Sequence, residues 1–318
     1  MTATSHPEFN DQTEALEVAR VFADAIRGKT VLVTGVNRGG IGFATAEAFD
    51  SIDELKLKFP SVDYRPLVIN LSSQQAVRTA AAELLSWPDV PTLDIIVNSA
   101  GIMLLPERII NEDGIEMHFA TNHIGHFLFT CLVMPKLIKA AEKNPKGSTR
   151  IINVSSASPT FSAMRWSDMN FEKTSKELPE AERPNYDVHR YWGEPDAENK
   201  SYIPLEGYNV SKVANVLFGI AANARLYDKY GILSLALHPG VIQTELVRSL
   251  GAGASTSLVA ALDPKLGVGK TKDGNENYGA YLADCQISDR ARPLAVSSDE
   301  AEKLWELSEK LVKERFAW

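Results

Sequence analysis

The chain has 318 residues, of which 44% are hydrophobic and 23% are charged, and its formal net charge is −8 at pH 7. This length and balance are typical of one large soluble domain, and the acidic charge argues against a protein that binds nucleic-acid phosphates through a basic face. Because there are only 2 cysteines and no apolar run reaches the roughly 18 residues of a membrane span, we expect a cytoplasmic protein without disulfides or a membrane span.

The first predicted element is a helix near the N-terminus. Residues 11–27 carry apolar side chains at helical spacing, and Gly28 is a suitable stop signal. We therefore predict two parts: a helical extension over residues 1–28, and a single domain over residues 29–318.

From residue 30 onward, short apolar runs alternate with longer stretches of helical periodicity. Five runs have the character of strands: residues 30–34, 64–69, 93–97, 150–154 and 232–238. The predicted helices between them cover residues 41–59, 74–84, 115–141 and 208–230. Strands that alternate with helices indicate an α/β fold, a doubly wound domain whose mostly parallel sheet has six strands.

The alternation is interrupted between residues 159 and 207. This segment is rich in proline, charged and aromatic residues. A loop of this length is uncommon unless it forms a lid or a binding surface, so we interpret it as an insertion that closes over a substrate. The alternative is a surface insertion that covers an exposed helix. A second irregular stretch, residues 251–277, follows the last clear strand.

A glycine-rich turn over residues 34–42 follows the first strand and opens a helix. Glycines let such a turn fold tightly and let backbone amides approach a pyrophosphate, which the positive end of the helix then stabilises. The position between strand and helix favours a dinucleotide site over a tight turn without a ligand.

A tyrosine and a lysine stand four residues apart, at Tyr208 and Lys212. This spacing puts a phenol and an ammonium group on the same face of a helix. A cation beside a phenol favours the phenolate and lowers the pKa of the phenol, which suits a group that exchanges protons near neutral pH. The same spacing also occurs on ordinary solvated helix faces.

From Lys29 to the C-terminal helix, the chain resembles the short-chain dehydrogenase/reductases, and among them the retinol-dehydrogenase-like members. The resemblance rests on six segments in a fixed order: residues 34–42, 98–101, 121–127 and 151–156, the pair Tyr208 and Lys212, and residues 238–244. It implies a Rossmann-like fold, a nicotinamide cofactor, a small carbonyl or alcohol substrate, and a monomer or homodimer.

The resemblance also implies roles for the catalytic residues. Tyr208 exchanges a proton with the substrate oxygen, and Lys212 keeps the tyrosine acidic and holds the nicotinamide ribose. Ser156 hydrogen-bonds the substrate oxygen and stabilises its developing charge. Because Ser155 and Ser158 are close neighbours in the chain, only one of the three serines is expected to face the substrate.

By the same resemblance, Asn122 anchors a water molecule that passes protons to Lys212. The residues expected to contact the cofactor are spread over five segments of the chain: Gly35, Asn37, Arg38, Gly40, Ile41, Asn70, Asn98, Ala100, Tyr208, Lys212, Val241 and Thr244.

One interval is shorter than the family pattern requires. Only residues 43–63 precede the run at 64–69, and a single crossover helix takes most of them. We therefore expect that about 20 residues, a strand with its flanking turns, are missing near residue 50. The end of that strand normally carries the group that distinguishes NAD from NADP. Arg38 is suited to a 2′-phosphate, so we predict NADP, with NAD left open.

Three functions compete on this basis. The first is an NAD(P)-dependent oxidoreductase that uses the serine, tyrosine and lysine. The second is a non-catalytic or impaired dinucleotide-binding variant, because of the shortened crossover. The third is a metal hydrolase, because His118, His123 and His126 share one predicted helix. No neighbouring carboxylate completes such a site, so we predict no metal.

Overall fold

The architecture is taken from a computed structural model, which describes residues 4–36, 63, 65–240, 247–268 and 277–318. Several predictions lie outside these residues: the helix at 41–59, the shortened crossover near residue 50, and the site residues Asn37, Arg38, Gly40, Ile41, Val241 and Thr244.

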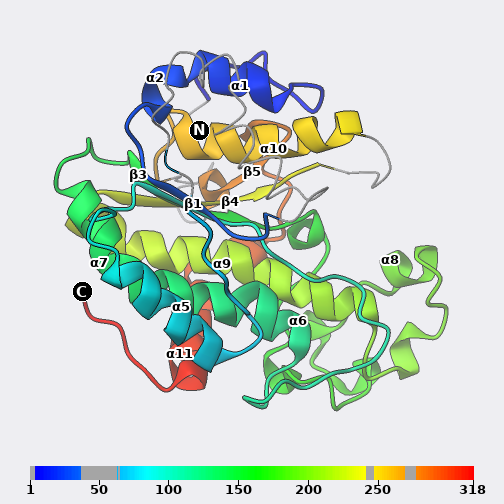
Figure 1. Cartoon of the computed structure of the whole chain (residues 1–318). Helices are drawn as coiled ribbons and strands as arrows, with labels where there is room; N and C mark the ends of the chain where they lie inside the picture. Colours follow the sequence, from blue (N-terminus) through cyan, green and yellow to red (C-terminus); the bar gives the residue numbers. More distant parts are fainter. Residues whose placement is uncertain (1–3, 37–62, 64, 241–246, 269–276) are drawn as a thin grey trace.

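A six-stranded sheet forms the centre of the molecule (Figure 1). Its strands follow one another in chain order. They are β1 (Val31–Val33), β2 (Ile95–Asn98), β3 (Thr149–Val154), β4 (Ile232–His238), β5 (Tyr281–Ala283) and β6 (Gln286–Ile287). The first five strands pair in parallel, and β6 is antiparallel to β5. The predicted α/β fold with a mostly parallel sheet is confirmed.

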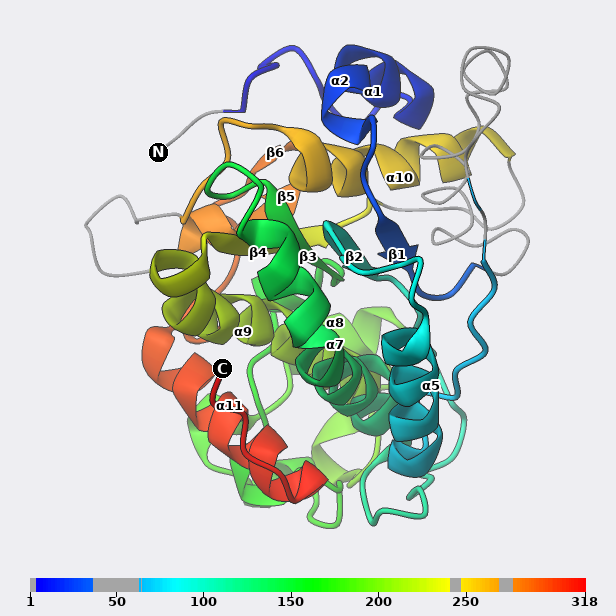
Figure 2. The same cartoon turned by 60° about the vertical axis from the view of Figure 1, so that its left-hand side comes forward.

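Helices cover both faces of this sheet, which explains why every residue of β2 and β3 is buried (Figure 2). One face carries α5 (Gln74–Ser86), α7 (Gly125–Ala141), α9 (Pro204–Tyr230) and, outside them, α11 (Ser298–Val312). The opposite face carries α10 (Val247–Leu262) and the N-terminal α1 (Ala15–Val21), with α2 (Ala23–Ile26) next in the chain.

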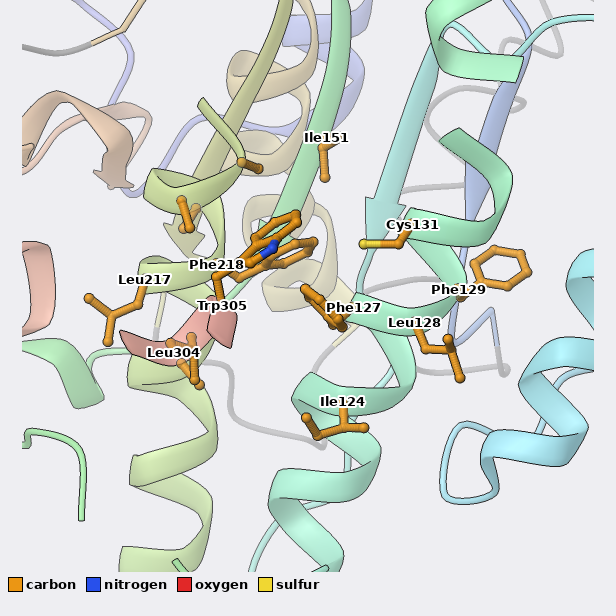
Figure 3. Packing of buried hydrophobic residues seen from close by; sticks show 14 of the residues in the cluster. Ile124, Phe127, Leu128, Phe129, Cys131, Ile151, Leu217, Phe218, Leu304 and Trp305 are labelled. Carbon is orange, nitrogen blue, oxygen red and sulfur yellow. The ribbon is translucent and has the colours of Figure 1, made fainter. Parts of the chain in front are cut away.

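An aromatic cluster holds α7, α9 and α11 together (Figure 3). The ring of Phe127 lies 5.6 Å from that of Phe218 and 5.0 Å from that of Trp305, both edge to face. Such pairs contribute about 0.5–1.5 kcal/mol each beyond the burial of their surface. The cluster therefore fixes the relative position of α7 and α9, the two helices next to the candidate site.

One described helical stretch, Met117–Ala141, has the length and apolar composition of a membrane span. It consists of α6 (Met117–Phe119), the π-helical turn η1 (Ala120–Ile124) and α7. Of its apolar window, 72% is buried inside the protein. Such burial against the sheet and the neighbouring helices is typical of a helix in the core of a protein.

The predicted strand at 64–69 is wrong for the residues that the structure describes there. Residues 65–70 have no strand pairing, and the side chain of Val68 is 88% exposed. Leu67 and Ile69, on either side of it, pack against the cluster that α5 and α7 share. An extended segment lying across helices thus produces the same alternation as a strand in a sheet.

The segment between residues 159 and 207 folds into short helical turns around buried polar anchors. These are η2 (Ser158–Thr160), η3 (Trp166–Asp168), η4 (Ser175–Glu177), η5 (Glu180–Glu182), α8 (Tyr186–Tyr191) and η6 (Ala197–Asn199). Arg165, which is 1% exposed, pairs with Asp168 at 2.7 Å and donates to the carbonyl oxygens of Lys173 and Ser201. Two further turns, η7 (Tyr278–Ala280) and η8 (Pro293–Val296), flank the last strands.

The N-terminal residues lie across α10 and the last strand. Ser5 donates through its amide and its hydroxyl group to the carboxylate of Asp263, at 2.6 Å each. Gln286 in β6 donates to the carbonyl oxygens of His6 and Phe9. The division of the chain at residue 28 stays a prediction, but these contacts attach the extension to the domain.

Candidate active site

The candidate site is built at the carboxyl ends of β1, β2 and β3. Thr34 Oγ1 accepts hydrogen bonds from the amides of Ser99 at 2.9 Å and Ala100 at 3.0 Å. Gly35 has φ +77°, and a Cβ there would lie 2.6 Å from Ala100 Cα. The turns after β1 and β2 therefore touch backbone to backbone, which only glycine permits at this position.

Asn122 lies in η1 and clamps the segment that follows β2. Its Oδ1 accepts from the amide of Ile102 at 2.8 Å, and its Nδ2 donates to Ile102 O at 3.0 Å and to Ser211 Oγ at 2.9 Å. The side chain is completely buried. Single π-helical turns are rare and occur often at functional sites. This one ties the end of β2 to α9.

Lys212 is buried on α9 and donates to Val154 O, at the end of β3, at 2.9 Å. Burial lowers the pKa of this ammonium group to about 8. A Cβ added to Gly101 would lie 3.2 Å from Asn122 Oδ1 and 3.4 Å from Lys212 Nζ. The asparagine and the lysine thus pack against the same glycine, where a Cβ would be crowded by both side chains.

Tyr208 precedes Lys212 by one turn, and its ring centre lies 5.6 Å from Lys212 Nζ. Burial raises the pKa of Tyr208 to about 12, and a hydrogen bond with Ser156 opposes this rise in part. The predicted lowering of this pKa by Lys212 is therefore wrong for this structure. Loss of hydration destabilises the phenolate form of Tyr208 more than the hydrogen bond with Ser156 stabilises it. The ammonium group of Lys212 donates to Val154 O.

Of the three neighbouring serines, Ser156 is the one that reaches Tyr208. Ser155 Oγ donates to Lys212 O at 2.6 Å, and Ser158 Oγ donates to Asn209 Oδ1 at 2.8 Å. The hydroxyl group of Ser156 donates to Ser158 Oγ at 2.7 Å. The structure thus brings Ser156, Tyr208 and Lys212 together in one place.

Two residues that were predicted to contact the cofactor, Asn98 and Asn70, have side chains that form hydrogen bonds within the protein. Asn98 Nδ2 donates to Thr130 Oγ1 and Asn153 Oδ1, so it points into the layer between the sheet and α7. Asn70 is exposed, and its Oδ1 accepts from the amide and hydroxyl groups of Ser72 before α5. Gly35 and Ala100 lie at the edge of the sheet where the catalytic candidates gather.

The three histidines of the metal hypothesis are bonded to separate partners. His118 Nδ1 lies 2.8 Å from Glu116 Oε1, His123 Nε2 lies 2.8 Å from Ser308 Oγ, and His126 Nε2 lies 2.8 Å from Thr34 Oγ1. Among the described residues, no group of three or more His, Cys, Asp and Glu side chains is placed to hold a metal ion.

Sequence reasoning missed several residues that support the site. Thr34 organises the end of β2, and Tyr281 in β5 donates to Ser156 O at 2.7 Å. The threonine could have been noticed because it stands directly after β1 and directly before the glycine-rich turn. The tyrosine lies in a three-residue strand that leaves no periodic signal.

A separate cavity of about 440 Å³ lies beside the insertion. All its lining residues except Arg292 come from that segment: Thr160, Phe161, Glu180, Arg183, Pro184, Asn185, Tyr186 and Arg292. Ser156, Tyr208 and Lys212 do not line it, so this cavity is separate from the candidate catalytic residues.

Comparisons with known proteins agree with this geometry. The family model of the short chain dehydrogenases matches residues 29–167. Oxidoreductase fscI of Fusarium equiseti is 32% identical over an alignment that covers 73% of this chain and 94% of that protein. Retinol dehydrogenase 14 of Mus musculus is 28% identical over an alignment that covers 90% of this chain and 86% of that protein.

Among solved structures, the crystal structure of an uncharacterized protein from Mycobacterium paratuberculosis is 26% identical and superposes with a TM-score of 0.62. The match covers 92% of this chain and 96% of that chain. The fold, the site at the carboxyl edge of the sheet and these similarities together show that the chain belongs to the short-chain dehydrogenase family of oxidoreductases, with retinol dehydrogenases among its relatives.

Proposed function

We propose that this oxidoreductase transfers a hydride between a nicotinamide dinucleotide and a carbonyl or alcohol substrate, with Ser156, Tyr208 and Lys212 as catalytic residues and Asn122 as their support. The observation that carries the proposal is the meeting of Tyr208 with Ser156, one helical turn from a buried Lys212. A phenol, a hydroxyl and an ammonium group at one strand end are the groups needed to move a proton at a substrate oxygen.

The residues around this place fit a dinucleotide. The turns that carry Gly35 and Ala100 approach each other closely, and Gly101 lies directly against Asn122 and Lys212. Ser99 Oγ is buried and has no hydrogen-bond partner among the described residues, so a polar group is available at the end of β2. Gly35, Ala100 and Lys212 would hold the cofactor, which would supply or accept the hydride.

At neutral pH the protonation states suit the donation of a proton to a carbonyl oxygen. With a pKa of about 12, Tyr208 keeps its proton and can donate it to the oxygen that receives negative charge. With a pKa of about 8, Lys212 is mostly cationic at pH 7 and stabilises the phenolate that remains. Ser156 can donate to the same oxygen once its hydroxyl hydrogen turns from Ser158 Oγ toward the substrate.

NADP is the cofactor that we propose, and the support is Arg38 in the glycine-rich turn, whose guanidinium group suits a 2′-phosphate. Fluorescence titration with NADPH and NADH tests the preference directly. Tighter binding of NADH would contradict it. Failure of both cofactors to bind would favour the alternative of an impaired variant with a shortened crossover.

The catalytic assignment is tested by following cofactor oxidation with a panel of aldehydes and ketones. Wild type is compared with Tyr208→Phe, and Tyr230→Phe removes the same atom at the far end of α9 as a control. We expect Tyr208→Phe to lose activity by about 100-fold or more and Tyr230→Phe to keep it. Equal rates in wild type and Tyr208→Phe would contradict the assignment.

A cytoplasmic location also stays part of the proposal. Both cysteines, Cys131 and Cys285, are free and buried, which is compatible with a reducing compartment. Microscopy of the tagged protein expressed in its own host tests this location.

A further inference from the structure

Two pairs of hydrogen bonds hold the backbone that follows β2. Asn122 bonds the amide and the carbonyl group of Ile102. Three residues later, the amide of Leu105 donates to His118 Nε2 at 3.3 Å, and its carbonyl oxygen accepts from the hydroxyl group of Tyr202 at 3.0 Å. The backbone is therefore fixed on both sides of the two residues between these positions.

The bonds at Leu105 are supported from inside the protein. A backbone amide only donates, so His118 Nε2 is the acceptor and the proton of the ring lies on Nδ1. Nδ1 then donates to Glu116 Oε1 at 2.8 Å, and Glu116 Oε2 accepts from the amide of Phe119 at 2.9 Å. The side chains of Glu116 and His118 are completely buried. Water therefore does not compete for these bonds, and the imidazole is held in one orientation.

Leu104 lies between the two pairs of bonds in a strained backbone conformation. Its φ is +57°, in the left-handed region that a residue with a Cβ rarely adopts. Burial does not offset the strain, because the residue is 46% exposed. Its neighbour Met103 is 48% exposed. Two large apolar side chains thus stand in solvent on a backbone that is fixed at both ends.

The other strained positions have local explanations. Among the described residues, four further non-glycine residues have positive φ: Phe171, Asp284, Cys285 and Lys313. Phe171 is buried in the core, Asp284 and Cys285 form the two-residue turn between β5 and β6, and Lys313 ends α11. Leu104 lies outside the core, the hairpin turn and the helix ends. Strain of this kind is typical of residues at functional sites.

The strained segment runs beside the candidate catalytic residues. At its start, a Cβ added to Gly101 would lie 3.4 Å from Lys212 Nζ. At its end, the supporting His118 touches α9 directly before Tyr208, since a Cβ added to Gly207 would lie 2.9 Å from His118 Nδ1. The exposed leucine therefore stands on a backbone that contacts the site at both ends.

We propose that Leu104 is a specificity-determining residue, which contacts an apolar group carried next to the reacting carbonyl of the substrate. An exposed apolar side chain gains free energy when an apolar ligand removes it from water. The bonds at Ile102 and Leu105 stop the backbone from turning the leucine inward. The inference rests on the proposed function and adds a substrate class, carbonyl compounds with an apolar chain.

Asparagine at position 104 separates the side chain from the strain. It is close to leucine in size and tolerates the left-handed region, but it is polar. Leu104→Asn should therefore keep the backbone and remove the apolar contact, and Leu104→Gly removes the side chain altogether. Lys313→Asn is the matched control, because Lys313 has φ +56° and is exposed at the end of α11.

The experiment measures kcat/KM for hexanal and propanal with NADPH, the Kd of NADPH and thermal unfolding in wild type and these variants. We expect wild type to prefer hexanal, and kcat/KM for hexanal to fall about ten-fold in Leu104→Asn and Leu104→Gly. The value for propanal and the Kd of NADPH should stay within about two-fold of wild type. Lys313→Asn should keep all three values. Neither asparagine variant should unfold at a lower temperature, because both relieve strain.

A ratio of the two kcat/KM values that stays within two-fold of wild type in both variants of Leu104 would overturn the inference. So would an equal change of this ratio in Lys313→Asn. If the turnover of both aldehydes is the same in wild type and Tyr208→Phe, the proposed function fails instead.

A binding measurement that needs no turnover covers that case. Hexanamide and propanamide are unreactive analogues of the two aldehydes, and ligand-observed NMR compares their binding with and without NADPH. Wild type should bind hexanamide more tightly, and Leu104→Asn should lose this preference. No preference in wild type, or the same preference in both proteins, would overturn the inference whether or not the protein reduces aldehydes.

Discussion

The ammonium group of Lys212 donates to the carbonyl oxygen of Val154 at 2.9 Å, which fixes α9 to the end of β3. The lysine is thus held by the sheet, and its Nζ lies 5.6 Å from the centre of the Tyr208 ring. The catalytic role that we propose for Lys212 and its contribution to stability are separable, because they depend on different properties of the same group.

The substitution Lys212→Met tests the proposed catalytic role of the lysine charge. Methionine has a similar length and fills the space, but it carries no charge to stabilise the phenolate of Tyr208. We expect kcat/KM for carbonyl reduction to fall by about 100-fold or more. Steady-state kinetics with saturating cofactor measures the loss, and a change of less than about three-fold would show that the charge is not needed.

The pH dependence of stability tests the burial of Lys212. Its folded-state pKa of about 8 lies below the ordinary lysine value of 10.5, so the unfolded chain binds this proton more tightly. The penalty on the folded state is therefore full below pH 8 and disappears as pH rises toward 10.5. A shift of this size corresponds to at most about 3 kcal/mol.

Urea unfolding from pH 7.5 to 10.5 checks this sign. The difference in the free energy of unfolding between Lys212→Met and wild type should be largest near pH 7.5 and shrink as pH increases. Using the difference removes the titration of groups that both proteins share. A difference that stays constant over this range would mean that Lys212 titrates normally.

The central strands could be predicted because each is a continuous apolar run between helices. The runs at 93–97, 150–154 and 232–238 overlap β2, β3 and β4 closely. The run at 64–69 failed because Leu67 and Ile69 alternate against helices instead of a sheet. The last two strands have three and two residues, which is too short for any periodicity to be recognised.

The part of the site that lies on a single helix could be predicted from the spacing of its residues in the sequence. Tyr208 and Lys212 lie one turn apart on α9, as expected. Spacing does not reveal where Nζ points or how much water surrounds the phenol, so the direction of the Tyr208 pKa shift was predicted wrongly. The contact of His189 with Glu206 joins the insertion to α9, and no pattern in the sequence predicts such a pair.

Gly35→Ala should damage both stability and cofactor binding. Its φ of +77° strains a side chain, and the new Cβ would lie 2.6 Å from Ala100 Cα. Gly28→Ala is a matched control, since φ is +74° there and nothing lies within 4 Å of the added Cβ. We expect a loss of about 1–2 kcal/mol at Gly28 and about 2–4 kcal/mol at Gly35, where overlap adds to the strain.

Urea unfolding and NADPH titration measure the two effects of the Gly35 substitution. Only Gly35→Ala should also weaken the binding of NADPH, because only this turn lies at the candidate cofactor site. Equal behaviour of the two alanine variants in both measurements would mean that the contact between the turns has no part in binding.

The chain contains two asparagines that clamp a backbone in the same way, and they allow a controlled test of Asn122. Asn122 bonds the amide and the carbonyl group of Ile102, and Asn223 bonds those of Ser234 at 2.7 Å each. Both side chains are buried, and the second clamp lies at the far half of α9, between it and β4.

Alanine at either position leaves two backbone groups without partners, so we expect each variant to lose about 2–4 kcal/mol of stability. Only Asn122→Ala should also lose activity, since it releases the segment beside Lys212 that Gly101 begins. Asn122→Asp should be equally inactive, because a carboxylate cannot donate to Ile102 O or Ser211 Oγ. Unfolding curves and kcat for the three variants decide the matter. If Asn223→Ala loses as much kcat as Asn122→Ala at equal stability, the loss of kcat is a general effect of destabilising the fold. Asn122 then has no specific role at the candidate site.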